Sequence, residues 1–295
     1  GYIGLEFAVS LRNLGKDVTV VELQPRVLGG RFDTEFTDGI TLHLKAKGIA
    51  FRTGVPAVAI EGQDDRVSGI QLADGSRIEA DAVLSAVGVR PMIDYADAFG
   101  LSHTPQGLVV SEYFETNQPD IFAIGDCIEV NSRITGRTYP GKLGSNAGQM
   151  ARMLALTLSG KKTKFKGVLN PMVSRFGDLA FGACGISELD ARESGWDVLV
   201  GRAQSTSIYA NMPGSNPVAV KALFRRSDLR FVGMEMLGQF NPAGFIESAA
   251  QLMEAEMDLY GVMTAPYASH PELTPKTSHP YLVTAAENAY KKLIG

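Results

Sequence analysis

The first fifty residues alternate between helical and strand-like spacing of their apolar positions. Apolar residues recur every three or four positions across Leu5–Leu14, which predicts a helix, and Gly15 follows at a position where helices commonly end. The β-branched run Lys16–Leu23 predicts a buried strand. A helix predicted over Asp33–Gly48 and a strand over Ile49–Thr53 repeat the alternation. This order predicts an α/β unit with parallel strands.

Short strands replace this pattern between residues 56 and 90. They are predicted at Val58–Ile60, Val67–Leu72 and Arg77–Ile78. Asp74-Gly75 lies between the last two and is a hairpin signal. Ala82–Ala86 predicts a buried strand that runs into a Val-Gly-Val-Arg-Pro string. We interpret residues 1–90 as a Rossmann-like βαβ dinucleotide-binding unit whose first strand lies upstream of Gly1.

A second segment spans residues 91–160 and is centred on one strand and one helix. Ile121–Ile124 predicts a strand that ends in Gly125-Asp126. A helix is predicted from about Ser145 to Leu158, because apolar residues form a stripe along one side of it.

Residues 165–295 have a different pattern. Antiparallel strands are predicted over Val173–Ile186, Val198–Tyr209, Pro217–Arg225 and Arg230–Leu237. Helices follow over Pro242–Leu259 and Tyr281–Leu293. Because the strands come first and the helices after them, we expect an α+β domain here.

The composition excludes several classes of protein. The chain has 295 residues and a net charge of −4, so it offers no basic surface for nucleic acid or anionic lipid. Its two cysteines, Cys127 and Cys184, form no CxxC pair, which argues against a disulfide scaffold or a cysteine-built metal site and fits a reducing compartment such as the cytoplasm. No apolar run of about 18 residues is present to span a membrane.

The opening of the chain carries candidate chemistry for a dinucleotide. Gly1–Glu6 is the second half of a GxGxxGxE turn, in which glycines let the backbone approach a diphosphate at a helix N-terminus. Glu22 ends the next predicted strand, where a carboxylate accepts both hydroxyls of a ribose and repels a 2′-phosphate. The alternative is a plain loop with a solvated charge. NADH is favoured over NADPH, although Arg26 could meet a phosphate. The cofactor-binding residues predicted here are Gly1, Ile3, Gly4, Glu6 and Glu22.

Two further glycines follow predicted strands and could lie against a cofactor. Gly88 follows the Ala82–Ala86 strand, and the alternative interpretation is a simple turn. Gly125 and Asp126 follow the second strand; the carboxylate could accept a hydroxyl of a ribityl chain, with the dipole of the following helix aimed at the ligand. The alternative is an Asx turn. The complete string Thr116–Asp126 is more informative than the Gly-Asp pair alone.

These motifs occur in an order and at a spacing that resemble the flavoprotein pyridine nucleotide-disulfide oxidoreductases. The branch most similar to the chain is that of coenzyme A-disulfide reductase, NADH oxidase and NADH peroxidase. The strings that carry the resemblance are Gly1–Glu6, Glu22, Val87–Pro91, Thr116–Asp126, Leu143–Ala147 with Arg152, Thr264–Ala268 and Pro280–Ala286.

The resemblance implies FAD and NAD as cofactors and a chain in three parts that works as a homodimer. Residues 1–90 would be the NAD-binding domain, 91–160 the second segment of the FAD-binding domain, and 165–295 an α+β dimerisation domain. Ala147 would lie beside the isoalloxazine ring. In the family, a first FAD segment with the redox cysteine precedes the NAD domain. This sequence lacks both, so we expect the chain as given to hold FAD poorly and to be inactive alone.

His270 is the catalytic candidate, although its surroundings match the family only in part. Ser269–Thr274 resembles the His-Pro string of the lipoamide and glutathione reductase branches, in which a carboxylate five residues on holds the histidine as an acid/base. Pro275 occupies that place here. His279 is a second candidate, and Cys127 is expected to be a small packing residue rather than a reactive thiol.

The resemblance predicts that the full protein passes a hydride from NADH to flavin and on to a disulfide, a persulfide or dioxygen. The expected substrate is a small molecule or low-molecular-weight disulfide, with no nucleic-acid or membrane partner. Two alternatives stay open. One is a non-catalytic nucleotide-binding and dimerisation fragment. The other is an electron-transfer flavoprotein similar to ferredoxin or rubredoxin reductase.

Overall fold

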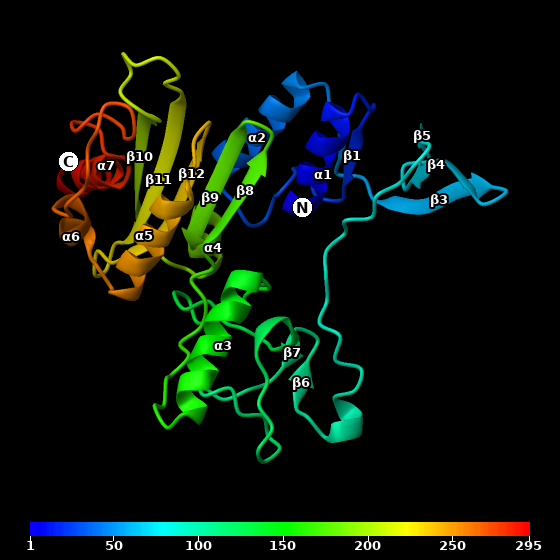
Figure 1. The fold of residues 1–295 in the computed structure, drawn as a ribbon, viewed down its shortest axis with the longest axis horizontal. Coiled ribbons are helices and arrows are strands. Elements are labelled where there is room, and N and C mark those ends of the chain that lie inside the picture. The colour runs from blue at the N-terminus through cyan, green and yellow to red at the C-terminus, as the bar shows by residue number, and fades with distance from the viewer. The chain divides into compact units, whose positions relative to one another are not determined.

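The computed structural model describes residues 1–295, which divide into two compact units (Figure 1). The first unit combines Gly1–Gly88 with Met172–Gly295, and the second is Val89–Pro171. None of the helices is long and apolar enough to cross a membrane. The first unit thus combines segments from both ends of the sequence.

The first part of this unit alternates helices with two parallel strands. Its elements are α1 (Tyr2–Asn13), β1 (Thr19–Glu22), α2 (Thr34–Ala46) and β2 (Ala50–Thr53). β1 and β2 pair in parallel, with Thr19 opposite Ala50. Leu5 and Ala8 bury the apolar side of α1, and Gly15 has a left-handed φ of +76° just after the helix ends. The predicted alternation is confirmed, with ends shifted by a few residues.

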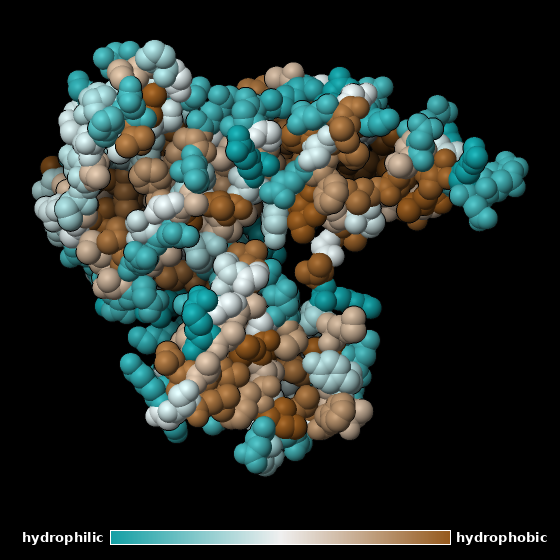
Figure 2. Space-filling view, in the orientation of Figure 1, coloured by the Kyte–Doolittle hydropathy of each residue, from teal (hydrophilic) through white to brown (hydrophobic).

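An antiparallel meander follows, built from β3 (Ala57–Gln63), β4 (Arg66–Leu72) and β5 (Arg77–Glu79). Asp74 and Gly75 form the turn between β4 and β5: Gly75 has a φ of +83°, and the Asp74 carboxylate accepts the N–H of Ser76 at 2.9 Å. Val58 and Ile60 on β3 are 58% and 60% exposed. Figure 2 shows hydrophobic side chains gathered over this meander, so β3 presents an apolar face.

Two predicted strands are not formed. Ala82–Ala86 lies outside any sheet and leaves Leu84 exposed, because no neighbouring strand exchanges backbone hydrogen bonds with it. Within Ile121–Ile124, only Phe122 makes an isolated bridge, to Glu115. The first prediction was wrong because apolar, β-branched residues favour a strand but a strand also needs a partner, which the local pattern does not reveal. Ile121–Ile124 does have a partner: the Ala123 N–H donates to the Phe114 carbonyl at 3.0 Å and the Thr116 N–H donates to the Ile121 carbonyl at 2.9 Å, but this pairing is limited to one bridge.

The C-terminal part of the first unit is a five-stranded antiparallel sheet. Its strands are β8 (Met172–Phe176), β9 (Leu179–Gly185), β10 (Val198–Thr206), β11 (Pro217–Arg225) and β12 (Phe231–Gly238), in the spatial order β10-β11-β12-β9-β8. The strand predicted over Val173–Ile186 is therefore two strands, because the chain turns at Gly177, whose φ is +73°. The helices of this part are α4 (Glu188–Glu193), α5 (Ala243–Glu254), α6 (Leu259–Met263) and α7 (Tyr281–Ile294).

Helices cover both faces of this sheet (Figure 1). On one face, α5 packs on β9 and β12, and α7 packs on β10 and β11. On the other face lies α2, where the Phe36 ring is 6.0 Å from the ring of Phe181 on β9. A Cβ added to Gly39 of α2 would come within 2.8 Å of Leu237 on β12, so the helix and the sheet are in close contact. The predicted class, an α/β chain with a C-terminal α+β domain, is confirmed.

The second unit has little regular structure apart from one long helix. It contains η1 (Asp97–Phe99), β6 (His103–Thr104), β7 (Gly107–Leu108), η2 (Gly125–Cys127) and α3 (Gly144–Leu158). Its core consists of Ala96, Leu101, Leu108, Phe114, Ile128, Val130, Met150 and Val168. Met150 brings the predicted apolar side of α3 into this core, beside the residues that follow η2.

Candidate functional site

The start of α1 and the end of β1 meet in the first unit. The backbone nitrogen of Gly1 lies 3.7 Å from Oε2 of Glu22, and the N–H of Gln24 donates to Oε1 of the same carboxylate at 3.0 Å. The Glu22 side chain remains 20% exposed. The structure therefore brings together the glycine turn and the carboxylate that the sequence assigns to the two halves of an adenosine diphosphate.

The start of α1 leaves backbone N–H groups without a partner in the protein. α1 begins with no side-chain cap and no acidic residue in its first turn, so its first N–H groups are available to a ligand. A Cβ added at Gly88, whose φ is +102°, would meet no atom within 4 Å. One added at Gly4 would lie 3.3 Å from the Cβ of Ala86. Gly4 thus packs against the segment that leads to Gly88, and Ile3 is exposed beside it.

Two neighbouring charged side chains are paired with other residues of the chain. The Glu6 carboxylate accepts the hydroxyl of Ser174 on β8 at 2.6 Å, so it fastens α1 to the sheet. The Arg26 guanidinium lies 3.0 Å from the carboxylate of Asp38 on α2. Arg26 is therefore held by an acidic group, an arrangement that competes with a nucleotide phosphate for this cation.

Gly125, Asp126 and Ala147 lie together in the second unit. Gly125 has a φ of +78°, and a Cβ there would lie 3.3 Å from the Cβ of Ala147, in the first turn of α3. The Asp126 side chain is exposed. α3 has no side-chain cap and no acidic residue in its first turn. An open carboxylate beside an uncapped helix N-terminus fits a ligand that carries both hydroxyls and phosphates, as a flavin dinucleotide does.

Lys142 holds this turn in place and was missed by the sequence analysis. Its ammonium donates to three backbone carbonyls, those of Gln106, Asp126 and Ile128, at 3.0, 2.7 and 3.2 Å. Partial burial lowers the pKa of Lys142, and the charge of the Asp126 carboxylate opposes this effect. Lys142 thus ties the η2 turn to the β6–β7 hairpin. A single lysine in a glycine-rich loop gives no periodic signal by which this role could be predicted.

His270 lies in an exposed local turn. The ring Nδ1 of His270 accepts the backbone N–H of Glu272 at 3.2 Å. The backbone N–H of His270 donates to the hydroxyl of Thr274 at 2.9 Å. The ring Nδ1 of His279 lies 2.7 Å from the hydroxyl of its neighbour Ser278. An acid/base role of His270 therefore stays a prediction. No group of His, Cys, Asp or Glu residues is arranged to hold a metal ion.

The two cysteines differ in their surroundings. The Cys127 thiol is half-buried and donates to the carbonyl of Ile124 at 3.2 Å. Cys184 lies inside β9, where burial raises the pKa of its thiol far above the ordinary range. A buried thiol with a raised pKa does not form the reactive thiolate.

Comparison with known proteins assigns the chain to a family. Residues 1–151 match the family model of the pyridine nucleotide-disulphide oxidoreductases, and residues 173–279 match the dimerisation domain of the same family. The chain therefore belongs to the pyridine nucleotide-disulphide oxidoreductases, as its motifs predicted.

Individual relatives fall in several branches of this family. The NADH oxidase of Methanocaldococcus jannaschii is 30% identical over 99% of this chain and 64% of its own length. The rubredoxin-NAD(+) reductase of Acinetobacter baylyi is 42% identical over 55% of this chain and 40% of its own length. The solved NAD-dependent persulfide reductase of A. fulgidus superposes on the whole chain with a TM-score of 0.92, at 28% identity and over 54% of its own length. The chain thus spans less than two thirds of each of these proteins.

Proposed function

We propose that the whole protein is an FAD-dependent NAD(P)H oxidoreductase that takes a hydride from NADH. It passes the electrons to a disulfide, a persulfide or dioxygen. The observation that carries the proposal is the meeting of Gly1 and Glu22 at the start of α1, in a chain whose family model covers residues 1–151. The relatives named NADH oxidase and persulfide reductase support this choice of donor and acceptors.

The first unit would bind the nucleotide. The free N–H groups at the start of α1 would donate to the diphosphate. The two carboxylate oxygens of Glu22 would accept the ribose hydroxyls, which favours NADH because a 2′-phosphate would be repelled. Gly88 would let the nicotinamide half lie against the backbone, since no side chain lies on its Cβ side.

The second unit would hold the flavin. Asp126 would accept a ribityl hydroxyl, and the N–H groups near Ala147 would face the isoalloxazine ring at the uncapped start of α3. Lys142 keeps the Asp126 turn in the conformation that presents this carboxylate. FAD, when bound, supplies the hydride acceptor, and the protein supplies its position and its electrostatic surroundings.

The remaining parts of the proposal concern assembly and location. The match of residues 173–279 to the family's dimerisation domain supports a homodimer. The two cysteines are both unpaired, which supports a reducing compartment such as the cytoplasm. The acceptor we propose is a small molecule or low-molecular-weight disulfide, and His270 is the acid/base candidate toward it.

An anaerobic titration tests the proposal directly. The whole protein, with any residues that precede Gly1, is purified and NADH is added in steps while flavin absorbance is followed. We expect bleaching by about one equivalent of NADH per flavin. Reoxidation is then timed with dioxygen, coenzyme A disulfide and persulfide. A whole protein that carries flavin but is not reduced by NADH or NADPH would contradict the proposal.

A second candidate function is electron transfer to a small redox protein. The identity of 42% with a rubredoxin-NAD(+) reductase over about half of the chain favours it. Reoxidation of the reduced protein by rubredoxin, but by none of the small acceptors, would support this function. A flavin-free whole protein that still binds NADH would instead support the non-catalytic alternative.

A further inference from the structure

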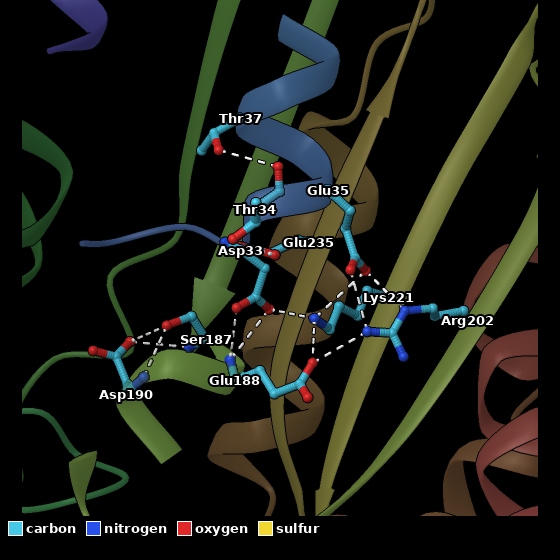
Figure 3. Close-up of polar contacts among 10 residues, drawn as sticks. All are labelled: Asp33, Thr34, Glu35, Thr37, Ser187, Glu188, Asp190, Arg202, Lys221 and Glu235. Atoms are coloured by element: carbon cyan, nitrogen blue, oxygen red, sulfur yellow. Dashed lines mark hydrogen bonds and ion pairs between the residues drawn. The ribbon is translucent and has the colours of Figure 1, made fainter. Parts of the chain in front are cut away.

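A row of three ionisable side chains crosses the sheet on the face covered by α2 (Figure 3). Arg202 on β10 is directly opposite Lys221 on β11, which is directly opposite Glu235 on β12. Lys221 and Glu235 are 1% and 2% exposed. Buried ionisable groups in the middle of a sheet need close partners, so the identity of these partners shows what the row does.

Lys221 is the centre of the row and binds three carboxylates. Its Nζ lies 2.7 Å from Asp33, 2.6 Å from Glu188 and 3.4 Å from Glu35. Arg202 in turn donates to Glu35 at 2.9 Å and to Glu188 at 3.2 Å. Two of these carboxylates, those of Asp33 and Glu35, come from the nucleotide-binding part of the chain. The row therefore joins the sheet to that part through ion pairs.

The loop that follows Glu22, residues 23–32, ends at Asp33, and Asp33 binds to the row. Its N–H donates to Oε1 of Glu235 at 3.1 Å. Its carboxylate accepts the N–H of Glu188 at 3.1 Å and contacts Lys221. Asp33 is 6% exposed and immediately precedes α2. Both its backbone and its side chain are thus fixed by residues of the C-terminal part.

The same loop begins at the proposed ribose contact. Gln24, near the start of the loop, donates its N–H to the Glu22 carboxylate. Gln24 and Lys221 also line one cavity of about 340 Å³, which extends along the loop to Asp33. A loop of ten residues held at both ends has few alternative conformations, and release of one end lets the other end move.

We propose that Lys221 is a positioning residue for the adenosine half of the bound nucleotide. Lys221 fixes Asp33, Asp33 fixes the end of the loop, and the loop keeps Gln24 and Glu22 in the orientation that accepts the ribose hydroxyls. This role rests on the proposed nucleotide site at Glu22. It extends that site to a buried lysine of the dimerisation domain.

Calorimetric binding of ADP-ribose to the whole protein tests this role without any turnover. Lys221→Met removes the cation, and Lys221→Arg restores it. We expect the Kd of ADP-ribose to rise about tenfold in Lys221→Met, which corresponds to about 1.4 kcal/mol, and to return most of the way in Lys221→Arg. In steady-state assays KM for NADH should rise by a similar factor while kcat changes less than twofold, because the reacting half of the nucleotide is not disturbed.

Two further variants separate positioning from folding. Asp33→Asn removes the charge that Lys221 binds, and so weakens the side-chain tie to the loop, but it leaves Lys221 paired with Glu188. It provides the same test if Lys221→Met does not fold. Lys292→Met is the matched control, because Lys292 donates to the carbonyl of Val200 on the edge strand of the same sheet and does not contact the loop. We expect Lys292→Met to keep the wild-type Kd.

The outcomes distinguish this inference from the function on which it rests. A wild-type protein that does not bind ADP-ribose would overturn both. A wild-type protein that binds ADP-ribose, with folded Lys221→Met and Asp33→Asn variants that bind it equally well, would overturn the positioning role alone. A rise in Kd in these two variants but not in Lys292→Met would support it.

Discussion

Replacing Lys142 with methionine should loosen the turn that carries Asp126. The ammonium makes three hydrogen bonds to carbonyls, and methionine keeps the length of the side chain but donates none. A hydrogen bond that involves a charged group contributes about 1.5–3 kcal/mol when it is buried. Because Lys142 is only partly buried, we take about 1 kcal/mol for each bond, so the turn should lose about 3 kcal/mol of local stability.

Hydrogen exchange followed by mass spectrometry measures this loss at the turn itself. A loss of about 3 kcal/mol corresponds to roughly 100-fold faster exchange in a peptide that covers residues 122–130. Lys161→Met is the control, because Lys161 is an exposed lysine of the same unit with no contact to the turn. We also expect less bound flavin in Lys142→Met. Equal exchange of residues 122–130 in the two variants would show that the three carbonyl contacts do not stabilise the turn.

Three other variants test separate parts of the structure. Glu22→Arg should lower kcat/KM for NADH and raise it for NADPH, because a cation suited to phosphate replaces two acceptors; an unchanged ratio would refute the ribose contact. Glu235 has a pKa raised by burial and by the Asp33 carboxylate, and only partly lowered by Lys221, so stability should fall as pH rises from about 4.5 towards the folded-state pKa. In Glu235→Gln, the free energies of unfolding measured by chemical denaturation at pH 5 and pH 8 should differ less than in the wild type, by about 1.4 kcal/mol for each unit of pKa shift. The same difference in both proteins would show that Glu235 is not held in its neutral form. Gly201→Ala places a Cβ against the carbonyl of Ala285 and should cost about 1–3 kcal/mol in thermal unfolding, whereas Gly244→Ala, with open space, should not; equal melting temperatures would show that α7 can shift.

The sequence predicted those elements whose pattern is local. α1, α2 and α7 follow from apolar spacing along single helices, and the Gly75 turn follows from residues that favour its backbone conformation. The strand predicted at Ala82–Ala86 is absent because its formation depends on a neighbour elsewhere in the chain.

The candidate site was predictable to a similar extent. The opening turn and Glu22 were predicted to form one site because their spacing is a known motif, and the structure brings them within 3.7 Å. Lys221 was missed because its partner Asp33 lies far away in the sequence. One signal was present: Lys221 and Glu235 each interrupt an otherwise apolar run with an ionisable residue, which usually indicates that each has a buried partner.

The order of synthesis gives the link between Asp33 and Lys221 a further consequence. All of residues 89–171 leave the ribosome after α2 and before the first strand of the five-stranded sheet. The Asp33 carboxylate therefore lacks its Lys221 partner until β11 is made, and the segment that carries Glu22 gains this support only then. A nascent chain stalled before Lys221 should hold the segment from Glu22 to Asp33 in a looser form, with Asp33 open to solvent and to proteases.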